Sequence, residues 1–230
     1  MTTLRDSPVD APGSVSSRHP RSGSGFARRR ASWNGLVAPS IAMAGGLLAG
    51  FLVLFAHESG SEMRVAGELG GPWLVAAFAA GAISKNRLLA AVTGFAALLA
   101  MLLGYYGLAH LDPGSEVAHT FRFWLAIAVV AGPVMGLAGW SWLGPRPFGR
   151  MLSISALAGC LIAEGVFFWS YGHRTVPVAE VAIGVAMALL LPARARERLL
   201  AVAGTAAVTV VASVIFEALK NAYSLFSPGF

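Results

Sequence analysis

The 230-residue sequence has few charged residues and a single cysteine, and each scarcity excludes a class of protein. Charged residues make up 12% of the chain, whereas roughly a quarter of the residues are charged in an ordinary soluble domain. Because Cys160 has no partner cysteine in the chain, a disulfide scaffold is excluded as well. Hydrophobic residues make up 56% and the mean hydropathy is +0.67. The sequence therefore predicts an all-α membrane protein that crosses the bilayer several times.

The sequence also lacks the short motifs of the common enzyme classes. It contains no GxSxG, no HExxH, no P-loop and no Rossmann glycine fingerprint. Its histidines and acids, such as His110, Asp112, Glu116 and His119, follow no metal-ligand spacing. We therefore expect a protein that is not an enzyme and that has neither a cofactor nor a metal site.

Seven hydrophobic segments predict a seven-transmembrane-helix bundle over residues 35–220. Five of them have close to the ~20 residues that a helix needs to cross ~30 Å of hydrocarbon: 36–56, 88–109, 123–144, 152–172 and 199–216. The other two, 72–84 and 181–193, are shorter, and we expect each to extend outward past an acid, Glu68 or Glu180. A re-entrant loop is the alternative for the first of these, because Gly70-Gly71-Pro72 is a point where a helix begins or breaks.

Basic residues predict the orientation of the bundle. Residues 1–34 contain six arginines among many Ser, Pro and Gly residues, which is typical of a disordered basic tail. Thirteen of the 17 Lys and Arg residues lie in this tail or in loops on the same side of the predicted bundle. The positive-inside rule then places the N-terminus in the cytoplasm of a bacterial plasma membrane and residues 221–230 in a short extracytoplasmic tail. We expect the tail to contact anionic lipid and not nucleic acid, because no folded motif accompanies its arginines.

Small residues and internal similarity predict how the helices pack. Residues 42–50 and 156–164 share five identities in nine positions, which suggests a 3+1+3 internal repeat; the alternative is chance similarity between helices rich in Ala, Gly and Leu. Small residues let helix backbones approach closely in a membrane. This packing serves either the bundle itself or a contact with a second copy or a partner membrane protein, and we assign it to Gly46, Gly50, Gly132, Gly136 and Gly159.

Glu164 is the one charged residue predicted to lie well inside the hydrocarbon layer. An ionised carboxylate costs at least ~2.5–3.5 kcal/mol there, so it should be protonated, paired or in contact with a water-filled cavity. Tyr171 lies on the same helix face, and Glu180 and Glu217 are predicted at the same outer end. We therefore expect an outward-facing cavity that binds a proton or a cation at Glu164, with these three residues as further candidate ligands. The alternative is that Glu164 hydrogen-bonds a neighbouring helix and that the other acids are merely interfacial.

Several stretches resemble a family of uncharacterised actinobacterial integral membrane proteins, a domain of unknown function. They are the run 71–82, the basic Lys85 and Arg87, Tyr105-Tyr106, Gly132-Pro133-x-x-Gly136 and residues 159–164. The resemblance covers residues 36–220, and the arginine-rich tail departs from the family pattern. It implies a multi-helix bacterial plasma-membrane protein without an assigned activity, and it assigns no site residue.

Two functional hypotheses follow. The first is a small-solute transporter, or a subunit of a larger uptake system, with a cavity around Glu164. The second is a non-transporting scaffold or accessory subunit that packs against partner membrane proteins through its Gly/Ala-rich helix faces. The position of Glu164, either beside a polar cavity inside the bundle or in a groove that faces lipid, distinguishes the two.

Overall fold

The computed structural model describes residues 37–58, 69–107, 116–172 and 174–226, and this part of the chain is helical throughout, apart from short connections. The predicted basic tail lies outside the described residues. The helices are α2 (Val37–Glu58), α4 (Gly71–Ala82), α5 (Arg87–Tyr106), α6 (Glu116–Trp142), α7 (Pro147–Ser170), α8 (Thr175–Leu190) and α9 (Ala195–Phe226). No strand occurs in these ranges. The predicted all-α fold with seven helices is confirmed.

Five of the seven helices, α2, α5, α6, α7 and α9, are long and apolar enough to cross a membrane. These are the five segments that the sequence predicts to be of full length. Helices α4 and α8 are shorter, with 12 and 16 residues. The helices support a multi-pass membrane protein in contact with the lipid bilayer.

The two short helices begin at different places relative to their acids. Helix α8 begins at Thr175 and so extends past Glu180, as expected. Helix α4 begins at Gly71, and Leu69 and Gly70 lie before its first residue, so the expected helical extension past Glu68 is wrong. Pro72 occupies the first turn of α4, where the missing N–H of proline costs no hydrogen bond. At 1.5 Å per residue α4 is about 18 Å long, which is little more than half of the hydrocarbon layer.

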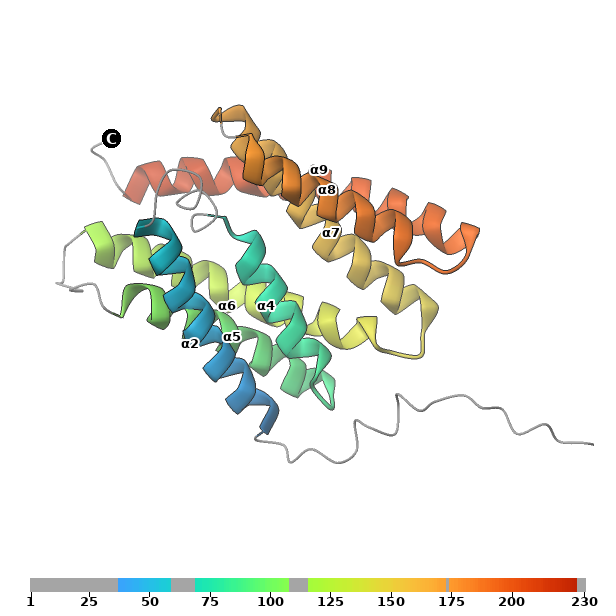
Figure 1. Ribbon diagram of the computed structural model, residues 1–230, viewed down its shortest axis with the longest axis horizontal. Coiled ribbons are helices and arrows are strands. Elements are labelled where there is room, and N and C mark those ends of the chain that lie inside the picture. The colour runs from blue at the N-terminus through green and yellow to red at the C-terminus, as the bar shows by residue number, and fades with distance from the viewer. Residues whose placement is uncertain (1–36, 59–68, 108–115, 173, 227–230) are drawn as a thin grey trace, which may run out of the picture.

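The helices form two groups, which Figure 1 shows side by side. Helices α2, α4, α5 and α6 pack together, and α8 and α9 both pack against α7. Helix α7 also contacts α6 and α4 and is the most deeply buried of the five long helices. Residues on α7 are therefore placed between the two groups.

The five glycines that the sequence assigns to helix packing all lie at contacts within the bundle. A Cβ atom at Gly46 would lie 2.5 Å from the Ala97 carbonyl oxygen of α5, and one at Gly159 would lie 2.6 Å from Cβ of Val208 on α9. Cβ atoms at the remaining three would overlap α5 backbone or come within 2.6 Å of it. These small residues bring neighbouring backbones of the same chain together; the three that face α5 in this way are Gly50, Gly132 and Gly136.

The proposed repeat relates α2, α4 and α5 to α7, α8 and α9, and these two sets of helices share only part of their packing. The first and third helices pack extensively in both, α2 with α5 and α7 with α9. The middle helix differs, because α4 packs mainly on α6 and α5 whereas α8 packs mainly on α7. The close contact of α4 with α6 depends on two glycines, since a Cβ at Gly81 or Gly139 would overlap the facing backbone. The internal repeat therefore stays a prediction.

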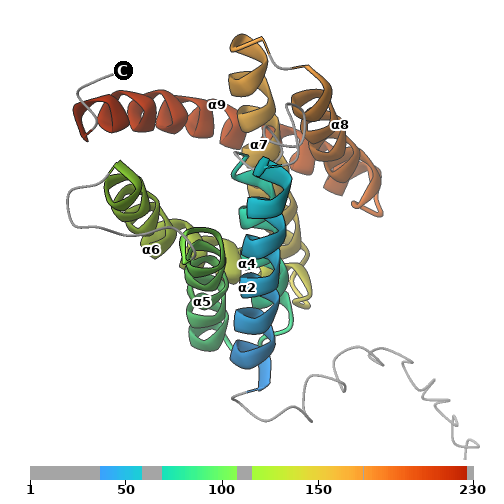
Figure 2. The same cartoon turned by 60° about the vertical axis from the view of Figure 1, so that its left-hand side comes forward.

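Helix α9 is longer than expected and joins the two groups at its far end. The predicted end of the transmembrane domain at residue 220 falls inside the helix, which continues to Phe226. Tyr223 lies next to α6, with its hydroxyl 3.1 Å from Oγ1 of Thr120 and its ring 5.2 Å from the ring of Phe123. Figure 2 shows α9 crossing α7 and reaching toward α6. The helix therefore includes residues 221–226 of the predicted C-terminal tail, and its end contacts α6.

Candidate functional site

Glu164 of α7 lies at the junction of α7 with the N-terminus of α4. Its side chain is buried, with 1% of the residue exposed. The backbone N–H of Gly70 donates a hydrogen bond to Oε1 of Glu164, and the backbone amide of Gly71 also interacts with this carboxyl group. The first amides of a helix have no partner within the helix and carry a partial positive charge. Glu164 therefore caps α4 from a neighbouring helix.

Glu180 of α8 approaches the same helix terminus. It is 7% exposed, and a Cβ atom at Gly71 would overlap its Oε1 atom. Helices α7 and α8 come close at this level because Gly165 has no side chain. A Cβ there would lie only 2.6 Å from the carbonyl oxygen of Pro177. The two carboxyl groups interact electrostatically. The site is thus a pair of buried acids that face two consecutive glycines at the start of α4.

The Gly70-Gly71-Pro72 sequence explains why α4 can begin between two acids. Each glycine lacks the side chain that would exclude a carboxyl group, and Pro72 favours helix initiation. The sequence marks this triplet as a point where a helix begins or breaks, and a helix does begin there, but the sequence does not assign the triplet to the site. A glycine pair at the start of an unusually short apolar helix, with two acids in other apolar segments, was the available signal.

One oxygen of each carboxyl group has no hydrogen-bond partner within the described part of the chain: Oε2 of Glu164 and Oε2 of Glu180. A buried polar atom without a partner costs roughly 1–3 kcal/mol. Neither acid pairs with a lysine or arginine of the described residues, where the ion pairs are Arg150–Glu197 and Lys220–Glu217. The arrangement therefore has spare acceptor capacity, and a proton or a cation would satisfy it.

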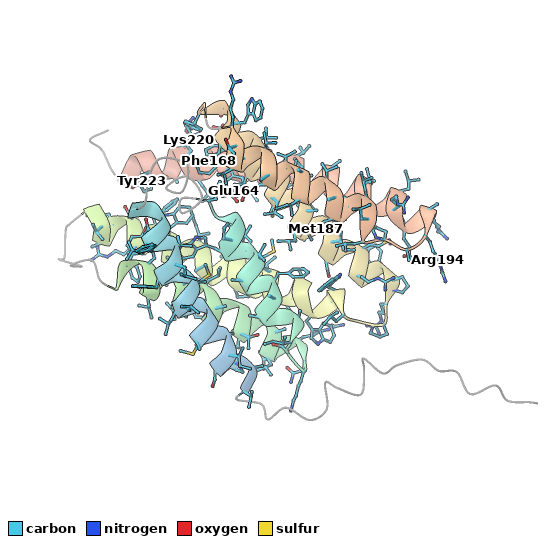
Figure 3. All side chains as sticks on the ribbon, in the orientation of Figure 1. Glu164, Phe168, Met187, Arg194, Lys220 and Tyr223 are labelled. Carbon is cyan, nitrogen blue, oxygen red and sulfur yellow. The ribbon has the colours of Figure 1, made fainter. Side chains whose placement is uncertain are left out.

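The other two predicted site residues lie in a separate, exposed cluster. Lys220 Nζ is 3.8 Å from Oε2 of Glu217 and 5.3 Å from the ring centre of Tyr171. The side chain of Glu217 is 60% exposed and Tyr171 is 50% exposed. In Figure 3 Glu164 lies among the helices, whereas Lys220 lies farther toward the end of the bundle. The structure thus brings Glu164 and Glu180 together and separates both from Glu217 and Tyr171.

The surface of α7 carries two apolar grooves, and neither is lined by the acids. The larger, about 510 Å³, lies between α7 and α8, and the smaller, about 260 Å³, lies between α7 and α9 beside Cys160. Glu164 itself is enclosed by helices, so the expected outward-facing cavity around it is not open in this conformation. The N-terminal turn of α4 occupies that position. Among the described residues, no group of three or more His, Cys, Asp and Glu side chains could hold a metal ion.

Comparison with known proteins identifies the family and no activity. A family model described as a family of unknown function, DUF6518, matches residues 29–222, so the chain belongs to this family. The match confirms the resemblance to a domain of unknown function, and it leaves out most of the arginine-rich tail, while an actinobacterial origin stays a prediction. No curated protein and no solved structure matches the chain.

Proposed function

Because its family has no assigned activity, we propose from the site itself that the protein is a small-solute transporter, or the membrane subunit of one, and not an enzyme. In this proposal the pair Glu164 and Glu180 binds the coupling ion. The observation that supports it is that both acids are buried and face the N-terminus of a half-length helix. Helices that begin or break within the membrane are a common feature of transporter binding sites.

The physical argument concerns what such a pair costs. Ionisable residues inside a membrane are expensive and are functional by default, because a purely structural contact could be made by a neutral side chain. An ion that enters or leaves the pair changes the charge beside the amides of Gly70 and Gly71, and so changes how firmly α7 holds the start of α4. A shift of α4 relative to α7 and α8 is the conformational step that we propose couples ion binding to solute movement.

The test begins with the solute. Purified full-length protein is screened for solute-dependent thermal stabilisation over a broad panel, and hits are followed as uptake into liposomes under an imposed ion gradient. Glu164→Gln and Glu180→Gln should each abolish gradient-driven uptake, because both remove a site that can change its charge. Glu217→Gln is the matched control, since it makes the same change in an exposed residue and should leave uptake intact. Gradient-driven uptake that is unchanged in both buried-site variants would contradict the proposal.

The membrane and the orientation are part of the same proposal. We place the protein in a bacterial plasma membrane with its N-terminus in the cytoplasm and its C-terminus outside, on the basis of the charge distribution. A Ser115→Cys variant in a Cys160→Ser background then carries a single cysteine. An impermeant thiol reagent should label it from outside intact cells. Labelling only after the membrane is permeabilised would reverse the orientation.

The grooves on α7 favour the alternative function, a non-transporting scaffold or accessory subunit. Both are lined almost entirely by apolar residues, and neither opens onto a polar site. Close helix packing into such a surface would hold a partner membrane protein or a second copy of the chain. Under this alternative, bulky substitutions at Val166 or Val211 would release a co-purifying membrane protein, whereas Glu164→Gln would leave that complex intact.

A further inference from the structure

We infer that the ion bound at this site is a proton: the pair Glu164 and Glu180 holds a single proton and excludes metal cations. As an assignment of the coupling ion this rests on the proposed function, but proton binding by the pair can be measured without any transport. The inference stands on the position of the two acids at a helix N-terminus, on the donor set around them and on the space available.

The first step concerns the number of charges. Glu164 and Glu180 face adjacent residues, Gly70 and Gly71, and the charge of Glu180 acts on the Glu164 carboxyl group. Two like charges that close to each other in a low-dielectric interior are strongly unfavourable, and a single proton removes the repulsion. The two oxygens without partners, one on each acid, provide the positions at which that proton can be carried.

The second step concerns the sign of the surroundings. The pair faces the N-terminus of α4, which presents N–H donors and a partial positive charge. The N–H groups of such an end are donors and cannot ligate a metal ion. Sodium sites in transporters instead use unwound carbonyl groups and helix C-termini, which present oxygen atoms and a partial negative charge. The helix end at this site therefore presents donors where a metal cation needs oxygen ligands, whereas a proton on a carboxyl group needs no ligand from the helix.

The third step concerns ligands and space. Calcium takes six to eight oxygen ligands and magnesium takes six, whereas the two acids supply four oxygens, one of which already accepts the Gly70 N–H. One described neighbour of the pair is apolar, because Cδ2 of Leu161 would lie 2.9 Å from a Cβ at Gly71. A proton needs neither further ligands nor additional volume. The described residues at the site therefore suit a proton and do not supply the number of oxygen ligands that a metal ion needs.

No other ionisable group of the described helices replaces the proton by supplying a charge partner to the pair. On α7 the nearest is Cys160, one turn before Glu164, and its thiol interacts with that carboxyl group. The sequence of α4 contains no ionisable residue, and that of α8 contains only Glu180. On α9, Glu217 is paired with Lys220 at the exposed cluster, and Glu197 is paired with Arg150 at the start of α7. Among the described residues, the field of Glu180 is the charge interaction that acts on Glu164.

Infrared difference spectroscopy between acidic and alkaline pH tests the inference on the full-length protein in lipid nanodiscs. The wild type should show the C=O stretch of one protonated carboxyl group that titrates as part of a pair. Glu164→Gln and Glu180→Gln should each displace the midpoint of the remaining acid by about one pH unit or more, because the like-charged partner is gone. The double variant should lack the band, and Glu217→Gln should match the wild type. A band that persists unchanged in the double variant would overturn the inference.

A second measurement does not need the glutamine variants to fold. The thermal unfolding midpoint of the wild type is recorded at constant pH while choline is exchanged for Na⁺, Mg²⁺ or Ca²⁺ at equal charge concentration. No midpoint shift is expected for any metal. Stabilisation by one metal that Gly71→Ala weakens, and that Gly45→Ala leaves intact, would assign the site to that metal. Gly71→Ala displaces Glu180, whereas a Cβ at Gly45 meets nothing within 4 Å.

The outcomes for the site and for the proposed function are distinguishable. A titrating carboxyl pair without any transported solute would leave the proton site in place and contradict the transporter. Uptake that is driven by a sodium gradient, in a protein without the carboxyl band, would support the proposed transport function and contradict the inference that the bound ion is a proton.

Discussion

Two of the sites that contain glutamate have opposite surroundings. One is the pair Glu164 and Glu180, and the other is the pair Glu217 and Lys220. Glu164 is buried and caps α4, while Glu217 is largely exposed and pairs with Lys220. Tyr171, which contacts Lys220, lies only about 10 Å along α7 from Glu164. Over this short distance the chain passes from an enclosed site with unsatisfied acceptor atoms to an exposed ion pair. The comparison shows that packing, and not the type of side chain, separates a candidate site from a surface contact.

The difference between Glu164 and Glu217 depends on α4. Two backbone amides at the start of α4, those of Gly70 and Gly71, interact with the Glu164 carboxyl group. Lys220 does not hold the Glu217 carboxyl group in the same way, because exposed ion pairs contribute little free energy and readily exchange with water. The following changes test this contrast in order of decreasing expected effect.

Truncation of the buried acid should have the largest effect on stability. Glu164→Ala removes the acceptor of the Gly70 N–H and leaves a cavity among α4, α7 and α8. We expect a loss of about 2–5 kcal/mol in the free energy of unfolding. Glu217→Ala should change it by less than about 0.5 kcal/mol. Denaturant unfolding in mixed micelles measures both, and equal losses in the two variants would remove the contrast.

A methyl group at the start of α4 should have an intermediate effect. Gly71→Ala forces a Cβ against Oε1 of Glu180 and Cδ2 of Leu161; because both atoms end flexible side chains, we expect a loss at the lower end of the overpacking range, about 1 kcal/mol. Gly45→Ala adds the same methyl group in open space on α2 and should be neutral or slightly stabilising. The unfolding midpoints of the two variants provide the measurement. A Gly71→Ala protein as stable as Gly45→Ala would show that the acids do not pack against this glycine.

An isosteric change should separate stability from activity. Glu164→Gln keeps an oxygen that can accept the Gly70 N–H, so we expect less than about 1.5 kcal/mol of lost stability. Solute uptake should nevertheless fall to background, because the amide cannot take up or release a proton. Parallel unfolding and uptake assays on one preparation test this. Loss of folding together with uptake would instead assign a structural role to the acid.

Changes in the exposed cluster should have the smallest effects. Lys220→Gln breaks the contacts with Glu217 and Tyr171, both of which lie at the surface. Tyr171→Phe keeps the ring that Lys220 contacts. Neither variant should shift the unfolding temperature measurably or alter uptake. A fall in uptake for either one would extend the site from Glu164 to the end of α7.

Much of the fold could be predicted because length and hydropathy act locally. The five long segments correspond to α2, α5, α6, α7 and α9, since a run of about 20 apolar residues has few alternatives to a membrane-spanning helix. The start of α4 could not be predicted in the same way. Gly70-Gly71-Pro72 is a local signal for a helix that begins or breaks, but the two carboxyl groups that contact this start come from other helices and have no local signal.

The candidate site shows the same division. A carboxylate in hydrocarbon is costly wherever it lies, so the sequence alone singles out Glu164. Glu180 and Glu217 both lie near predicted helix ends, and Glu217 has a basic residue, Lys220, three positions further along the chain. The structure pairs these two residues on α9, whereas the crossing of α7 and α8 at Gly165 places Glu180 beside Glu164.

By itself, then, the sequence determined the membrane class, the number of helices and the acid that most requires a partner, because apolar length and charge burial have costs that do not depend on the fold. The tertiary structure decided which acid joins it, what the two of them face and that α4 begins there. Those features depend on the approach of α4 to α7 and α8, which lie far from it along the chain, and close approach at glycines is a property of the packed bundle.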